Sequence, residues 1–115
     1  MTAPREFVDY LCDIRDAAAK AREFVARMTF DQFAADEKTA YAVVRCLEII
    51  GEAARKVPEP VRARYPQMPW QEMMGMRNVL IHDYMGVNYR VVWNTVQDDL
   101  PPLAPELDRM IAENS

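Results

Sequence analysis

Apolar residues recur at steps of three and four along most of this chain, which is the spacing of one buried face of an α-helix. The first stripe runs from Phe7 to Met28 and predicts a helix over roughly residues 5–28. A second stripe runs from Ala40 to Ala54, and Pro58 ends its helix because the residue before a proline avoids the α region. No segment alternates strictly between apolar and polar residues over a strand length, so we expect an all-α protein.

Shorter helical signals lie between the long stripes. Residues 29–32 resemble a helix start, followed by a break and a second start near Asp36. The connector over residues 58–68 has room for one short turn of helix. A third stripe then begins behind a proline, at a place where the first turn of a helix tolerates one, and covers residues 70–81.

The fourth stripe covers residues 89–111 and crosses Pro101-Pro102, so this segment is either a kinked helix or two helices in line. In the second case, Asp98 or Asp99 would cap the second helix. Four main helices with short connections predict an antiparallel four-helix bundle with a kinked or split C-terminal helix. We expect residues 1–115 to form a single domain, because a chain of 115 residues does not support two independent cores.

Composition excludes several classes of protein. The longest apolar runs are too short to cross a bilayer, and the N-terminus carries acidic residues where a signal peptide needs an apolar stretch. Cys12, Cys46 and His82 are the only cysteine and histidine residues, too few for a Cys/His zinc site. The two cysteines are best interpreted as small apolar core residues. We therefore expect a cytoplasmic, soluble protein with no metal, cofactor or membrane association.

The formal net charge of −4 disfavours nucleic acid over the molecule as a whole, so contact with phosphates needs a local basic patch. The one clear candidate contains Arg55, Lys56, Arg62 and Arg64, with only Glu59 among them. This patch is either a solvated connector or a surface that contacts RNA.

Arg77 breaks the pattern of the third stripe. At 100° per residue, the apolar residues of that stripe lie within about 60° on either side of Arg77. A guanidinium stays charged and is costly to bury alone, so it needs a carboxylate, a cleft or an anionic ligand. Glu48 and Glu52 on the second helix are the obvious carboxylates for a buried ion pair. A carboxylate can also orient an arginine that binds phosphate, so the two interpretations are compatible.

His82 lies about 140° from Arg77 on an ideal helix, so a site that uses both needs local unwinding, a long reach or a second copy of the chain. A lone histidine is commonly structural. Here, however, Arg77, Asn78 and Tyr84 place a cation, an amide and a phenol around one imidazole.

The outer face of the second helix is partly apolar. Ile49 points away from the core stripe, with Ala42, Cys46 and Ala53 to one side. This face is covered either by a partner, such as a second copy in a homodimer, or by a short helix of the same chain.

The segment from Arg77 to Tyr84 reads R-N-x-x-x-H-x-Y and resembles the signature of HEPN-domain ribonucleases, specifically the HepT-like (DUF86) toxin family. The segment from Leu47 to Ala54, LEIIGEAA, is similar to that family's second-helix signature. Further matches are Tyr65-Pro66, Pro69-Trp70, Gly75-Met76 and Asp99-Leu100-Pro101. An arginine and a histidine at this spacing are a weak signal alone, but these flanking matches in the same order cover nearly the whole chain.

The resemblance implies a HEPN-like helical bundle that dimerises around one cleft and cleaves RNA without a metal ion. By the same resemblance Arg77 and His82 are the catalytic pair and Asn78 supports the pocket, beside Glu48 and Glu52. Family members typically pair with an MntA-like nucleotidyltransferase antitoxin, which transfers AMP to the motif tyrosine, here Tyr84. Two other functions fit the residues: a non-catalytic helical module that binds such a nucleotidyltransferase, and a bundle that holds a small phosphate ligand.

Overall fold

The computed structural model describes residues 5–81 and 88–115, and for residues 77–81 it describes the backbone alone. Helices account for most of this part of the chain, and it contains no strand. The elements are α1 (Phe7–Phe24), α2 (Phe30–Ala35), α3 (Glu37–Lys56), α4 (Glu59–Ala63), α5 (Trp70–Ile81), α6 (Tyr89–Asn94), the π-helical turn η1 (Thr95–Asp99) and α7 (Leu103–Asn114).

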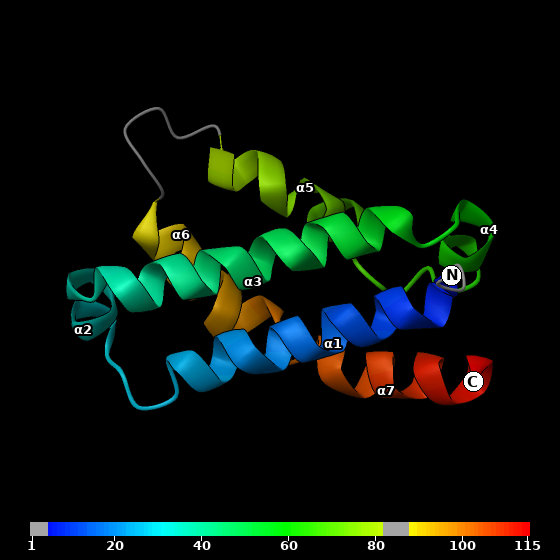
Figure 1. Ribbon diagram of the computed structural model, residues 1–115, viewed down its shortest axis with the longest axis horizontal. Coiled ribbons are helices and arrows are strands. Elements are labelled where there is room, and N and C mark those ends of the chain that lie inside the picture. Colours follow the sequence, from blue (N-terminus) through cyan, green and yellow to red (C-terminus); the bar gives the residue numbers. More distant parts are fainter. Residues whose placement is uncertain (1–4, 82–87) are drawn as a thin grey trace, which may run out of the picture.

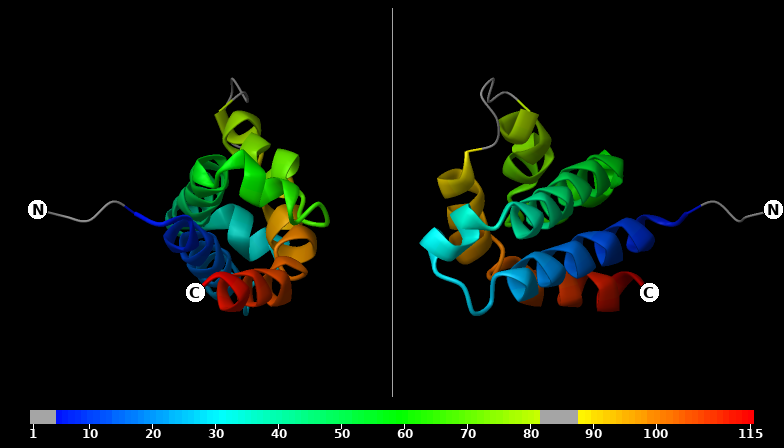
Figure 2. Two further views of the ribbon diagram at one scale, coloured as in Figure 1. Left: turned by 90° about the vertical axis from the view of Figure 1, so that its right-hand side faces the viewer. Right: turned by 60° about the vertical axis from the view of Figure 1, so that its left-hand side comes forward.

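Four helical rods lie side by side (Figure 1). α1 and α3 run antiparallel and pack along their lengths, and α5 lies antiparallel on α3. The fourth rod is divided into α6, η1 and α7, and α7 packs on α1. Viewed along the long axis, the rods enclose a common centre (Figure 2). The predicted all-α bundle with a split C-terminal helix is confirmed.

The buried side chains follow the predicted stripes and form one continuous core. Leu11 and Ile14 of α1 are fully buried, as are Val43 and Ile50 of α3 and Leu107 of α7. Each such side chain contributes on the order of 1.5–3 kcal/mol through removal of apolar surface from water. The 3.6-residue periodicity in the sequence therefore corresponds to the side of each helix that faces the core.

Local hydrogen bonds fix the starts of α2 and α3. The Thr29 hydroxyl accepts from the Gln32 amide at 3.2 Å, and the Gln32 side chain accepts from the Thr29 amide at 2.9 Å, a reciprocal capping box. The Asp36 carboxylate accepts from the amide and the hydroxyl of Thr39 at 3.1 and 2.7 Å. These bonds hold the pKa of Asp36 below its ordinary value. Both predicted helix starts are confirmed.

Two boundaries differ from the sequence prediction. α1 ends at Phe24, four residues before the predicted end, because residues 25–29 form the connection to α2. The prediction that Asp98 or Asp99 caps the last helix is wrong, because Pro102 occupies the cap position of α7. The backbone stays in the right-handed helical region at Leu100 and Pro102, so α7 starts at the prolines without a side-chain cap.

The apolar side of α3 is covered within the same chain. Cys46 and Ala53 are buried, and Ile49 is half-buried against the core. The cover comes from the long helices α1 and α5, which pack on α3 from two sides. Burial raises the pKa of the Cys46 thiol, consistent with a small core residue, whereas Cys12 is only half-buried. None of the helices described is long and apolar enough to span a membrane.

Candidate functional site

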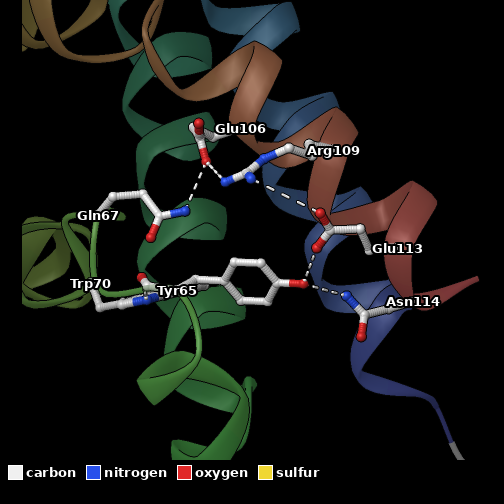
Figure 3. Close-up of polar contacts among 7 residues, drawn as sticks. All are labelled: Tyr65, Gln67, Trp70, Glu106, Arg109, Glu113 and Asn114. Atoms are coloured by element: carbon white, nitrogen blue, oxygen red, sulfur yellow. Dashed lines mark hydrogen bonds and ion pairs between the residues drawn. The ribbon is translucent and has the colours of Figure 1, made fainter.

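Helix α5 carries the first half of the predicted motif, and polar contacts anchor its start. The indole N–H of Trp70 donates to the backbone carbonyl of Tyr65 at 3.0 Å. The Tyr65 hydroxyl in turn donates to Glu113 of α7 at 2.6 Å and accepts from the Asn114 amide at 2.9 Å (Figure 3). The loop ahead of α5 is thereby tied to α7, and Trp70 is buried at the start of the helix.

Two arginines of the basic patch hold the middle of α5. Arg55 of α3 donates to the backbone carbonyl of Met74 at 3.3 Å. Arg62 of α4 donates to the carbonyl of Val57 at 3.1 Å, and its guanidinium lies 3.2 Å from the Met74 sulfur. These two arginines link α3 and α4 to α5, so at least half of the patch has a structural role.

The other two basic residues of the patch contact the chain elsewhere. The ammonium of Lys56 lies 5.7 Å from the centre of the Tyr10 ring. Arg64 donates to the Asn114 side chain at 3.3 Å and lies 5.9 Å from the centre of the Tyr65 ring. All four basic residues thus have intramolecular contacts, while Arg55, Lys56 and Arg64 stay exposed, and contact of the patch with RNA stays a prediction.

The register of α5 supports the placement of Arg77 on the inner line of the helix. Arg77 is four residues after Met73 and seven after Trp70, and both of these side chains are buried. Residues at such spacings lie on one face of an α-helix. Asn78 is the next residue of α5, and the side chains of both lie outside the described part. His82 and Tyr84 lie outside the described residues altogether.

The two predicted acidic partners lie on α3, the helix on which α5 packs. Glu48 is half-buried and accepts from Arg45, one turn earlier, at 3.4 Å, and Glu52 is exposed. An exposed pair such as Arg45–Glu48 contributes little stability, so Glu48 can exchange this partner for another cation. The predicted pairing of Glu48 or Glu52 with Arg77 involves a side chain outside the described part and stays a prediction.

The sequence did not single out the cleft beside α5. Residues from α3, α5, α6, η1 and α7 line it, and acids from three of these elements face it. Glu72 lies 26 or more residues before the other acids of the cleft, and no spacing rule links positions so far apart, so only the tertiary structure reveals this arrangement. Among the residues described, no three His, Cys, Asp or Glu side chains are grouped closely enough to hold a metal ion.

Comparison with known proteins identifies the class of protein that this bundle and motif define. Residues 14–110 match the family described as "Ribonuclease HepT-like". The chain therefore belongs to the HepT-like ribonuclease family, as the sequence resemblance predicted.

Individual relatives match over nearly their whole length. The chain is 43% identical over 106 residues to the probable ribonuclease HepT of Thermococcus cleftensis, covering 92% of this chain and 96% of that protein. It is 38% identical over 109 residues to a candidate RNase of Methanocaldococcus jannaschii, with 95% and 90% covered. A candidate RNase of Caldanaerobacter subterraneus subsp. tengcongensis is 35% identical, with 96% of each chain covered. No solved structure matches the chain.

Proposed function

We propose that this chain is a metal-independent endoribonuclease, the toxin of a toxin–antitoxin pair, which cleaves RNA at a site shared by two copies of the chain. The observation that carries the proposal is the motif from Arg77 to Tyr84, which lies inside the family match over residues 14–110. The curated relatives named as ribonucleases, at 35–43% identity, support the activity. The packing of α5 on α3 supports a site between these two helices.

Each motif residue has a role that suits its chemistry. Metal-independent cleavage uses the neighbouring 2′-hydroxyl as the nucleophile, so a base must remove its proton. The imidazole of His82, with an ordinary pKa near 6.5, suits that task at neutral pH. Negative charge accumulates on the phosphate oxygens in the transition state, and the forked guanidinium of Arg77 stabilises it. Asn78, Glu48 and Glu52 support the pocket by orienting these groups.

A shared site resolves a shortage of catalytic groups. Cleavage needs a base for the 2′-hydroxyl and an acid for the departing 5′-oxygen, and His82 is the only histidine in the chain. A symmetric dimer with two motifs around one cleft supplies two imidazoles. The expected products are a 2′,3′-cyclic phosphate and a free 5′-hydroxyl.

The test is cleavage of single-stranded RNA by the purified chain, in EDTA, with the product ends identified by mass spectrometry. Arg77→Ala and His82→Ala should each lower the rate by about 10²–10⁴-fold, the usual worth of a positioned acid–base or charge-stabilising group. Arg27→Ala is the matched control, because Arg27 is exposed in the connection between α1 and α2, and its rate should stay that of the parent chain. Circular dichroism should show that all three variants remain folded.

Full activity in both motif variants would refute the catalytic assignment. An inactive parent chain that still binds a nucleotidyltransferase would instead favour the non-catalytic interaction module. Growth separates these outcomes independently, because expression of the chain without its partner stops growth only if the chain is a toxin.

A further inference from the structure

A cleft of about 650 Å³ separates α5 from the segment formed by α6, η1 and α7. Its floor is apolar and rich in methionine. The floor residues come from α3, the loop before α5, α5 itself, α6 and α7. Methionine side chains adapt to differently shaped partners and are common on surfaces that bind several of them. The apolar lining residues include Leu47, Met68, Met73, Met76, Val91, Val92 and Leu103.

Acidic residues surround this floor. Glu72 comes from α5, Asp98 and Asp99 from η1, and Glu106 from α7. The residues that line the cleft include no lysine, arginine or histidine within the part of the chain described. Glu106 accepts from Arg109 at 2.7 Å and from Gln67 at 3.0 Å. Glu72, Asp98 and Asp99 are exposed, and among the residues described they form no hydrogen bond or ion pair.

The cleft is built on fixed elements. The amide of Leu100 donates to the carbonyl of Thr95 at 3.1 Å, five residues back, which closes the wide π-helical turn that carries Asp98 and Asp99. At the other end, the Gln67–Glu106 bond joins the loop before α5 to α7 (Figure 3). The carboxylates and the apolar floor are therefore presented together, without a change in the fold.

The charge of the cleft selects among the possible occupants. RNA and anionic lipid both carry phosphates, which these carboxylates repel. A second copy that pairs face to face through the same cleft would place its own carboxylates against them, since a two-fold contact brings identical patches together. A small polyamine would satisfy the acids but leave the apolar side chains that open to the cleft, the half-buried Met76 and the exposed Val91, uncovered.

We propose that this cleft binds a cationic, amphipathic helical segment of a partner protein. Its apolar side chains lie on Met68, Met73 and Met76, and its lysines or arginines pair with Glu72, Asp98 and Asp99. Helix-in-groove binding of this kind combines burial of apolar anchors with charge complementarity at the edge. Binding of such a segment does not depend on RNA cleavage, so it is measured without RNA.

The probe is a fluorescein-labelled peptide of about 18 residues, composed of leucine and lysine at the spacing of an amphipathic helix. Its control is a peptide of the same composition in scrambled order, which has the same charge but no apolar face. Fluorescence anisotropy at physiological salt should show tighter binding of the amphipathic peptide to the full chain. Equal binding of the two peptides would overturn the proposal, because it would reflect the net charge of the protein alone.

Two variants place the binding in the cleft. Asp98→Lys/Asp99→Lys should weaken the Kd by at least about tenfold, as loss of close charge pairs does. The matched control is Asp31→Lys/Asp108→Lys, which makes the same change of charge at two exposed positions that do not line the cleft, and it should change the Kd by less than about threefold. Equal weakening by the two double variants would overturn the proposal.

Gly75 allows the cleft to be filled without strain. It lines the wall on α5, and a Cβ atom placed on it has no neighbour within 4 Å. Gly75→Phe should therefore keep the fold and block the peptide, whereas Gly75→Ala should leave the Kd unchanged. Unchanged binding to Gly75→Phe, or displacement of the peptide by spermine with no effect of that variant, would overturn the proposal in favour of a small polycation.

Methyl resonances give a direct map that does not depend on the variants. In methionine methyl-labelled protein, the peptide should shift the signals of Met68, Met73 and Met76. The signal of Met110, which is fully buried in α7 and does not line the cleft, should stay in place. Shifts confined to other methionines would overturn the assignment.

Light scattering should give the same oligomeric state for Gly75→Phe and the parent chain, and loss of a dimer would identify the cleft as a contact between copies instead.

Discussion

Phe33 shows how a single residue joins a short helix to the rest of the bundle. It is fully buried, although α2 has only six residues. Its ring lies 5.9 Å from the ring of Tyr89 and 5.5 Å from that of Trp93, both on α6. Aromatic pairs at these separations add stability beyond the area they bury.

Truncation of this residue should be costly. Phe33→Ala should lower the free energy of unfolding by about 3–5 kcal/mol through lost burial and the cavity left behind. Phe24→Ala is the matched control, because Phe24 is 44% exposed, and its cost should stay below about 1 kcal/mol. Urea unfolding followed by circular dichroism measures both. Should Phe33→Ala fail to fold, Phe33→Leu provides the comparison, and equal costs for Phe24 and Phe33 would contradict the packing described.

For the arginines, the sequence predicts the face of the helix on which a residue lies, but it does not predict the partner that the side chain contacts. The periodicity of α5 placed Arg77 among buried positions because an ideal helix fixes the angle between residues. The same reasoning could not tell that Arg55 and Arg62 donate to backbone carbonyls and that Arg62 also contacts a sulfur. Those partners lie on other elements, and which carbonyl an arginine reaches is set by the packing of helices.

Among the elements, the long helices were predictable and the irregular ones were not. α1, α3 and α7 are amphipathic over three or more turns, so their apolar spacing alone locates them. The π-helical turn η1 has no such signature. It lies between α6 and α7, just before Pro101-Pro102. The amide of Leu100 there donates to the carbonyl of Thr95, five residues earlier, and this bond widens the turn.

α6 begins immediately after residues 82–87, and its start depends on one cap. The Asn88 side chain accepts from the amides of Arg90 and Val91 at 3.0 and 3.2 Å. Asn88→Ala should destabilise the protein by about 1 kcal/mol, because it leaves helix-terminal donors without their partner.

Asn94→Ala is the control for this cap. Asn94 is exposed at the other end of the same helix, and its side chain makes no hydrogen bond to the residues described. Its replacement should change the free energy of unfolding by less than about 0.5 kcal/mol. Hydrogen exchange of the α6 amides should accelerate only in Asn88→Ala, and acceleration in both variants would contradict a specific cap.

At the scale of the whole molecule, acidic and basic residues have different roles. The net charge of −4 disfavours RNA in general, and the acidic cleft directs phosphates away from one side of α5. The arginines near α4 are held by intramolecular contacts. RNA binding in the proposed site therefore depends on the motif cations themselves, and activity should be sensitive to any anion fixed beside Arg77.

Adenylylation would place such an anion. In the proposed reaction, the Tyr84 hydroxyl attacks the α-phosphate of ATP, forms a phosphodiester and releases pyrophosphate, so the product carries a bulky anion two residues from His82. Co-expression with the MntA-like nucleotidyltransferase should raise the intact mass by one or more AMP units, mapped to Tyr84 by peptide sequencing, and abolish RNA cleavage. Tyr84→Phe should stay unmodified and active.

Tyr41→Phe is the control, since Tyr41 is 65% exposed and accessible to any enzyme that lacks specificity. AMP on Tyr41, or full modification of Tyr84→Phe, would show that the motif tyrosine is not the target. The nucleotidyltransferase would then modify exposed tyrosines without recognising the motif.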